Sequence, residues 1–98
     1  MAVVVEILVP RGTQAQYDQL DIGMEAATGQ MGGPPPGLVV HVVRPVGEGF
    51  LLSQVWRGEA DMRPFYDEVM LPKLVDAGLE PREPSVSTVW GFAARSSA

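Results

Sequence analysis

The sequence contains no cysteine and no asparagine, and it has a single histidine among 98 residues. Without cysteine the chain cannot form a disulfide, a thiol nucleophile or an iron–sulfur cluster, and it suits a reducing compartment. One histidine, with carboxylates that follow no ligand spacing, does not make a metal centre. We therefore expect neither a metal site nor a disulfide framework.

Basic residues and long apolar runs are also scarce. Seven Lys and Arg stand against twelve Asp and Glu, which gives a formal net charge of −5 at pH 7. This is the wrong sign for a surface that neutralises phosphates, so no nucleic-acid partner is expected. No run approaches the roughly 18–20 apolar residues of a membrane span, and the apolar opening, residues 1–10, carries Glu6 and lacks a basic segment. We expect a cytoplasmic protein with no membrane partner.

What the chain does have is enough apolar material for one small core. Hydrophobic residues make up 46% of the sequence, which excludes intrinsic disorder, and the length fits a single domain. We expect this domain to span residues 1–93 and to be followed by a flexible C-terminal tail over residues 94–98.

Hydrophobic periodicity and turn residues divide the chain into six elements. β-branched runs predict strands, and apolar residues three to four apart predict helices. The predicted order is strand 3–9, helix 13–28, strands 38–43 and 50–56, helix 59–77 and strand 86–92. This βαββαβ order predicts an α+β fold, the ferredoxin-like plait, in which two helices cover one face of a four-stranded antiparallel sheet.

Glycine and proline place the boundaries of these elements. Thr13 and Gln16 have the spacing of a capping box at the start of the first helix. Residues 29–37 combine glycines with three consecutive prolines and predict a loop, which we interpret as the rim or lid of a pocket; a polyproline ligand is the alternative. In the second helix, Pro64 is tolerated if Asp61 lies near the N-cap, and Pro72 predicts a kink or restart.

The strands are apolar on both of their faces. Val4 and Leu8 alternate with Val3, Val5 and Ile7, and the strand around Val40 and Val42 is similar. Two helices cover only one face of a sheet, so the other face needs an apolar partner. A second copy of the chain is the simplest one, and we predict a homodimer.

Several short strings, spread over nearly the whole chain, resemble the dimeric α+β barrel superfamily, and in particular small proteins of the antibiotic biosynthesis monooxygenase type. The strings are Pro36-Gly37-Leu38 with His41, Gly49 leading to Val55-Trp56, Phe65-Tyr66, Leu71-Pro72 with Leu74, and Ala77-Gly78. The resemblance implies cytosolic dimers with an apolar pocket between sheet and helices in each subunit. It also implies that no cofactor is needed, because some relatives oxygenate phenolic or quinone-precursor substrates without metal or flavin.

The chain departs from these relatives at two points. Well-described cofactor-free and haem-degrading relatives use an active-site asparagine, and this chain has none. Similar small proteins often carry an acidic residue where this chain has Gln54. The only histidine lies on a strand, which fits haem degradation poorly.

His41 is the first candidate for catalysis, because its ordinary pKa lies near neutrality and it interrupts an apolar strand. A turn centred on residues 47 and 48 would pair His41 with Gln54 and Val39 with Trp56, and so place His41, Gln54 and Trp56 on one face. A slip of one residue would put Ser53, Val55 and Arg57 there instead. A histidine that is hydrogen-bonded within the core or the dimer interface is the alternative to a general base.

Aromatic residues are the candidates for ligand binding. They could form the walls of a pocket for an aromatic compound, with tyrosine hydroxyls that orient a phenol or carbonyl, or they could simply pack in the core. The predicted ligand-binding residues are Tyr17, Gln54, Trp56, Phe65, Tyr66 and Trp90.

Two functions therefore follow from the sequence. One is a cofactor-independent monooxygenase, or a related acid–base catalyst, that acts on a small aromatic or polyketide-like compound with His41 as the catalytic residue. The other is a non-catalytic dimeric barrel that binds a small apolar or aromatic molecule or serves a structural role.

Overall fold

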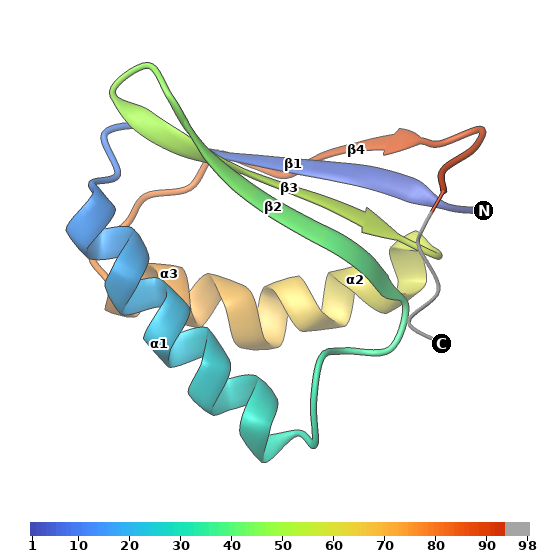
Figure 1. Ribbon diagram of the computed structural model, residues 1–98, viewed down its shortest axis with the longest axis horizontal. Helices are drawn as coiled ribbons and strands as arrows, with labels where there is room; N and C mark the ends of the chain where they lie inside the picture. Colours follow the sequence, from blue (N-terminus) through green and yellow to red (C-terminus); the bar gives the residue numbers. More distant parts are fainter. Residues whose placement is uncertain (94–98) are drawn as a thin grey trace.

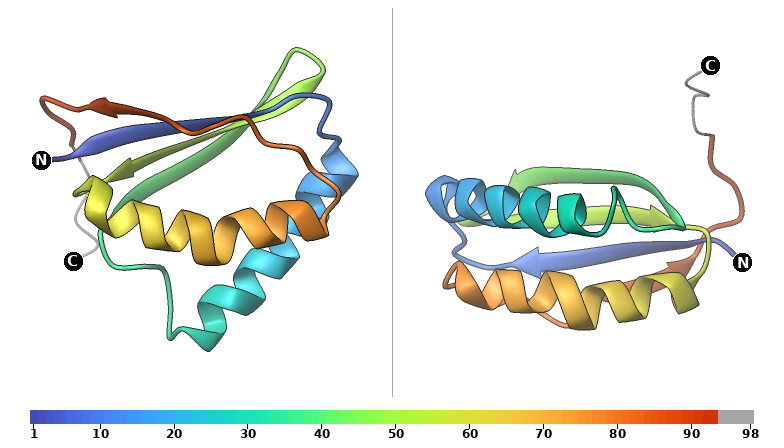
Figure 2. Two further views of the ribbon diagram at one scale, coloured as in Figure 1. Left: turned by 180° about the vertical axis from the view of Figure 1, so that it is seen from behind. Right: turned by 90° about the horizontal axis from the view of Figure 1, so that it is seen from below.

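The computed structural model describes residues 1–93, which form a four-stranded antiparallel sheet with two helical segments against one face (Figures 1 and 2). The elements are β1 (Val3–Val9), α1 (Gln14–Gln30), β2 (Leu38–Val46), β3 (Gly49–Trp56), α2 (Glu59–Phe65), η1 (Tyr66–Met70), α3 (Leu71–Asp76) and β4 (Ser85–Thr88). The strand order across the sheet is β2-β3-β1-β4. The predicted ferredoxin-like α+β fold is confirmed. The predicted tail, residues 94–98, lies outside the described residues.

The core lies between the sheet and the helices, because every second side chain of the central strands points that way. In β1, Val5, Ile7 and Val9 have no exposed surface, while Glu6 and Leu8 between them are exposed. β3 alternates in the same manner. Burial of an aliphatic side chain contributes about 1.5–3 kcal/mol, so this alternation sets which face the helices cover.

Helix α1 begins with the predicted capping box. The backbone N–H of Gln16 donates to Thr13 Oγ1 at 3.1 Å, and the Thr13 N–H donates to Gln16 Oε1 at 3.0 Å. The helix continues to Gln30, two residues beyond the prediction, and the Met31 N–H still bonds to the carbonyl of Ala27. The connecting loop therefore spans residues 31–37.

The second helical segment changes pitch in its middle. η1 is a π-helical turn in which the Leu71 N–H bonds to the carbonyl of Tyr66, five residues back. Pro72 follows directly; it lacks an N–H, and its ring would clash with the carbonyl four residues back in a regular α-helix. The predicted disturbance at Pro72 is thus a π turn. The expectation of an N-cap near Asp61 is wrong, because the N-cap is Gly58 and Pro64 lies inside α2.

The β2–β3 hairpin turns at Gly47, whose φ of 56° is a conformation that glycine adopts readily. Val46 pairs with Gly49 and His41 pairs with Gln54, as the predicted turn requires. The predicted pairing of Val39 with Trp56 is wrong. The register shifts between Leu38 and Val40, so that Leu38 is the residue opposite Trp56. This irregularity is a β-bulge, in which one extra residue of β2 is left without a partner.

Strand β4 is shorter than the predicted strand 86–92. It pairs with β1 from Ser85 to Thr88, and the Val89 N–H bonds to the carbonyl of Ala2. Its neighbour β1 begins at Val3, so residues beyond Val89 have no strand beside them. Trp90 and Phe92 therefore come after the last strand in the chain and are not part of the sheet.

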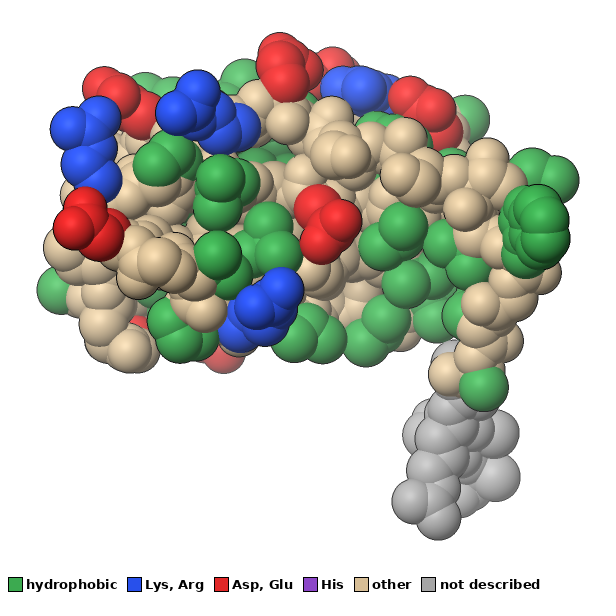
Figure 3. Space-filling view, turned by 90° about the horizontal axis from the view of Figure 1, so that it is seen from above, with side chains coloured by type: hydrophobic (Ala, Val, Ile, Leu, Met, Phe, Trp, Pro, Cys, Tyr) green, Lys and Arg blue, Asp and Glu red, His purple; other side chains and the backbone are tan. Residues whose placement is uncertain are grey.

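The helix-free face of the sheet carries many hydrophobic side chains interspersed with polar surface, with one acidic side chain near its middle and most other charged side chains toward its edges (Figure 3). Val40 and Val42 are 46% and 50% exposed there. By the pairing of the strands, this face carries Val4, Leu8, Val40, Val42, Leu51 and Val55 together with Glu6, Arg44 and several serines. We call these six apolar residues the outer apolar face.

None of the helices within residues 1–93 is both long enough and apolar enough to cross a membrane.

Candidate functional site

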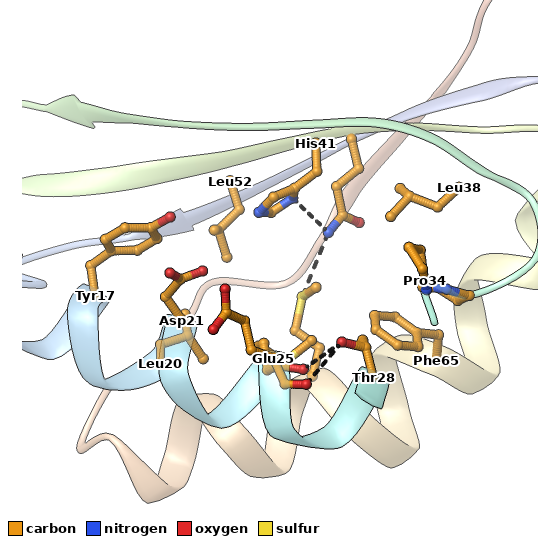
Figure 4. A pocket seen from close by; sticks show the side chains of 14 residues that line it. Tyr17, Leu20, Asp21, Glu25, Thr28, Pro34, Leu38, His41, Leu52 and Phe65 are labelled. Carbon is orange, nitrogen blue, oxygen red and sulfur yellow. Dashed lines mark hydrogen bonds between the residues drawn. The ribbon is translucent and has the colours of Figure 1, made fainter. Parts of the chain in front are cut away.

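A cavity of about 200 Å³ lies between the helix-facing side of the sheet and α1 (Figure 4). Most of its wall is apolar, and α1, β2, β3, the 31–37 loop and the second helical segment all contribute. The lining residues are Tyr17, Leu20, Asp21, Met24, Glu25, Thr28, Pro34, Pro35, Leu38, His41, Leu52, Gln54, Phe65 and Met70. A concave apolar wall with a few converging polar groups is typical of a site for a small molecule.

The strand register brings the two central polar residues of this wall together. His41 and Gln54 are directly opposite on β2 and β3, and opposed residues of antiparallel strands share a face. That face is the one the helices cover. Gln54 is only 3% exposed, whereas His41, on the edge strand, keeps contact with solvent at the mouth of the cavity.

Hydrogen bonds connect three side chains in a row that runs from His41 at the cavity, through Gln54, to the buried Trp56. The indole N–H of Trp56 donates to Gln54 Oε1 at 2.8 Å, and Gln54 Nε2 lies 3.2 Å from His41 Nδ1. Gln54 Nε2 also lies 3.9 Å from Met70 Sδ. Both the oxygen and the nitrogen of the Gln54 side-chain amide therefore have hydrogen-bond partners. A buried polar group needs such partners because water cannot reach it.

The pKa of His41 is lowered from its ordinary value of 6.5, chiefly because partial burial disfavours the charged imidazolium. Asp21 on α1 opposes this shift by its negative charge. The net effect favours a neutral imidazole near pH 7.

The cavity wall on α1 is acidic. Asp21 and Glu25 are one turn apart, and their carboxylates lie on the cavity side of the helix below His41 (Figure 4). Thr28 belongs to the same stripe, but its hydroxyl donates to the carbonyl of Met24 at 2.9 Å and is therefore occupied within the helix. Sequence reasoning missed both carboxylates. Asp21 follows Tyr17 by four residues and Glu25 follows Asp21 by four, and this helical spacing was the signal that could have indicated them.

The structure brings together four of the predicted site residues. His41, Tyr17, Gln54 and Phe65 line the cavity. The pKa of Tyr17 is raised, first by burial and then by the negative charges of Asp21 and Asp18, so its hydroxyl stays protonated and can donate.

Three other predicted residues do not reach the cavity. Trp56 has no exposed surface and lies behind Gln54, with its ring 5.7 Å from that of Phe65. Tyr66 is buried in the core, which is the first cause of its raised pKa. Trp90 is 99% exposed, because the chain leaves the sheet before reaching it. Trp56 therefore supports the cavity wall, and Trp90 lies away from it.

No group of three or more His, Asp or Glu side chains in residues 1–93 has an arrangement that could hold a metal ion.

Solved structures share this fold over nearly their whole length. The cofactor-independent oxygenase SnoaB from Streptomyces nogalater matches with a TM-score of 0.62 at 15% identity, over 93% of this chain and 94% of its own. Two proteins that are assigned by name to the antibiotic biosynthesis monooxygenases match with TM-scores of 0.58. The one from Deinococcus radiodurans is 11% identical and covers 100% of both chains. The one from Chloroflexus aurantiacus is 16% identical and covers 95% of this chain and 99% of its own.

No protein-family profile and no curated protein sequence matches this chain. The similarity is therefore one of structure: the chain has the fold of antibiotic biosynthesis monooxygenase-like proteins, as the resemblance predicted.

Proposed function

We propose that the cavity binds a small aromatic or polyketide-like compound and that the protein is a cofactor-independent monooxygenase or a related acid–base catalyst. The observation that carries the proposal is the largely apolar cavity in which His41, held by the buried Gln54, lies across from the carboxylates of α1. An apolar wall selects a flat hydrophobic ring, and the polar wall orients its oxygen substituent. The shared fold with a cofactor-independent oxygenase is compatible with this chemistry.

The chemistry begins with loss of a proton from the bound compound. Removal of the proton leaves an electron-rich anion, which can reduce dioxygen without a cofactor. For an anthrone, the overall reaction converts one CH₂ group and one O₂ into one carbonyl group and one water. The cavity assists by excluding bulk water and by holding the anion beside polar groups, which strengthens their electrostatic effect.

Oxygen uptake with a panel of anthrones and hydroquinones tests this function. We expect turnover of at least one anthrone, with one atom of ¹⁸O₂ in the new carbonyl, and a strong loss of activity in His41→Ala. Ile22→Ala is the control, because Ile22 is 70% exposed on α1 and does not line the cavity. Uptake no faster than the buffer rate with every compound would contradict the proposal.

A specific observation favours the second candidate, a non-catalytic binding barrel. The lone pair of His41 Nδ1 faces the Gln54 amide, so this nitrogen is not available to take a proton from a ligand. Native mass spectrometry of the purified protein distinguishes the two candidates. A small molecule retained unchanged in air, together with no oxygen uptake, would favour binding over catalysis.

We also propose that two copies of the chain associate in the cytoplasm through the outer apolar face. The support is the apolar composition of that face, where Val40 and Val42 remain about half exposed in the single chain. Monomeric proteins rarely expose contiguous apolar patches of this kind without a use for them. A second copy would cover the face on both chains at once.

A further inference from the structure

The orientation of the Gln54 amide determines where the proton of His41 lies. The Trp56 indole nitrogen can only donate, so the atom 2.8 Å from it must be the carbonyl oxygen of Gln54. If the amide were flipped, its NH₂ group would face the indole N–H and its oxygen would face Met70 Sδ, which is also an acceptor. Both contacts would be repulsive. The amide NH₂ of Gln54 must therefore face His41.

This orientation acts in turn on the imidazole. The NH₂ group of Gln54 can only donate, so His41 Nδ1, 3.2 Å away, must accept with its lone pair. A neutral imidazole has one protonated and one unprotonated nitrogen, and the proton of His41 is consequently on Nε2. Protonation of Nδ1 would place two donors against each other. The second nitrogen of the ring faces away from Gln54, toward the side of the cavity that carries Tyr17 and Asp21 (Figure 4).

We propose that His41 is a neutral hydrogen-bond donor to a ligand oxygen, through Nε2–H, and that the carboxylate of Asp21 is the group that accepts the ligand's proton. Asp21 is chosen because it is the charged group whose field acts on His41, and because it lines the same cavity. His41 and Asp21 are joined by no hydrogen bond or ion pair of their own in the structure. A ligand oxygen bound between them would complete the row Trp56–Gln54–His41–ligand–Asp21.

The proton moves from the ligand to Asp21, and no other residue of the site gains or loses one. The O–H bond of a ligand hydroxyl, which in an anthrone is the hydroxyl of its anthranol tautomer, breaks; its proton passes to an oxygen of Asp21, and the electron pair stays on the ligand and is shared between its oxygen and the ring carbon that reacts with dioxygen. His41 Nε2–H stabilises the resulting oxyanion without itself changing protonation state. Glu25, one turn further along α1, adds a second negative charge at the mouth of the cavity, which disfavours ligands that are already anionic. The assignment of Asp21 rests on the proposed function, whereas the tautomer of His41 does not.

The tautomer is tested by two-bond ¹H–¹⁵N correlation spectra of the unligated protein, recorded above the pKa of His41. We expect an unprotonated, pyridine-type Nδ1 and a protonated, pyrrole-type Nε2. Gln54→Glu should reverse this pattern, because a carboxylate accepts from both Trp56 and Nδ1–H. A protonated Nδ1 in the parent protein, or averaged shifts for the two nitrogens, would overturn the proposal without any substrate being known.

The roles of the two residues are tested by kinetics with the anthrone found in the oxygen-uptake panel. Asp21→Asn should lower kcat/KM by about 10²–10⁴-fold, the usual contribution of a general base, while Asp18→Asn, a matched change on the same helix outside the cavity, should not. Gln54→Glu converts Nε2 into an acceptor and should lower kcat/KM by about 10–10²-fold. Faster turnover in Gln54→Glu would show that His41 is the base, and full activity in Asp21→Asn would exclude Asp21.

If no compound is turned over, binding of 2-hydroxyacetophenone, which carries a hydroxyl beside a carbonyl, replaces the kinetic readout. We expect the Nε2–H resonance of His41 to shift on titration of the parent protein and the affinity to fall in Gln54→Glu. Binding that leaves the Nε2–H resonance unchanged would overturn the donor role. This arm separates failure of the donor assignment from failure of the proposed oxygenase function.

Discussion

His41 illustrates how neighbouring side chains decide the chemistry of one residue. A histidine on a strand is open to either tautomer and to protonation, but in this chain Gln54 fills the Nδ1 side and the cavity wall partly excludes water. The titratable groups that face the ring are Asp21, Glu25 and Tyr17, all from α1. Burial lowers the pKa of His41, and the negative charge of Asp21, which favours the charged imidazolium, offsets only part of that shift.

The lowered pKa of His41 predicts a particular dependence of stability on pH. Because the folded-state pKa is below the unfolded value of about 6.5, the unfolded chain binds more protons between these two values. The contribution of His41 is therefore fully present above pH 6.5 and declines as the pH falls toward the folded-state pKa. Urea denaturation from about pH 5 to pH 8 should show this decline in the parent and less of it in His41→Gln. A parallel pH dependence in the two proteins would contradict the lowered pKa.

Trp56 does not line the cavity, but its indole N–H should contribute to stability and fix the orientation of the Gln54 amide. Trp56→Phe leaves the buried Gln54 Oε1 without its donor, which should cost about 1–3 kcal/mol of stability from the lost partner alone, and it frees the amide to flip. Chemical denaturation measures the first effect, and ¹⁵N shifts of His41 that become averaged report the second. Adding Gln54→Leu should recover part of the loss, because both polar partners are then removed. Equal stability of Trp56→Phe and the parent would show that the indole N–H does not hold the amide.

At the scale of single helices and strands, some features depend on residues close together in the chain, and others depend on contacts between distant segments. The start of α1 depends on residues three apart in the chain, and the sequence indicates it correctly. The π turn of η1 precedes Pro72 directly in the chain, and its last residue, Met70, lines the cavity beside Gln54, which comes from a distant strand. The bulge at Val39 lies within an apolar run, which predicts a strand but not an irregularity in its pairing.

The capping box of α1 gives a direct test at this scale. Thr13→Ala removes the acceptor of the Gln16 N–H and should reduce the free energy of unfolding by about 0.5–2 kcal/mol. Thr13→Ser keeps the hydroxyl and should remain close to the parent. Thr13 is exposed, so lost packing contributes little to the comparison. Thermal or urea midpoints that are equal for the alanine and serine variants would contradict the role of the cap.

At the scale of the whole molecule, the two faces of the sheet have different uses. The face toward the helices contains the core and the cavity, and the outer apolar face is open to solvent in the single chain. His41 lies on the first of these faces. The proposed dimer would therefore form without covering the polar wall of the cavity.

Val40→Glu and Val42→Glu test the dimer. Both side chains are about half exposed in the single chain, so a charge there should cost little in a monomer, whereas an interface would have to bury it unpaired. We expect the parent to sediment as a dimer at micromolar concentration and the variants to sediment as folded monomers. Val75→Glu is the control, because Val75 is 60% exposed on α3, away from the sheet. A parent mass that stays monomeric at every concentration would remove the proposal.

Much of the fold could be read from the sequence, because it depends on interactions between near neighbours. The capping box, the turn at Gly47 and the alternation of Val5, Glu6 and Ile7 all operate within a few residues. The pairing of His41 with Gln54 follows from that turn, since a two-residue connection sets the register of the strands next to it.

Only the tertiary structure decided the rest, because the partners come from distant parts of the chain. The bulge before Val40 moves Trp56 opposite Leu38, and the packing of α1 over the sheet brings Asp21 below His41. Trp90 lies outside the sheet because β4 pairs only with β1, and β1 begins at Val3, so no strand is available beside Trp90. The residue types near the cavity were visible in the sequence. Which of them donates, accepts or lies outside depends on hydrogen-bond partners that only folding brings within reach.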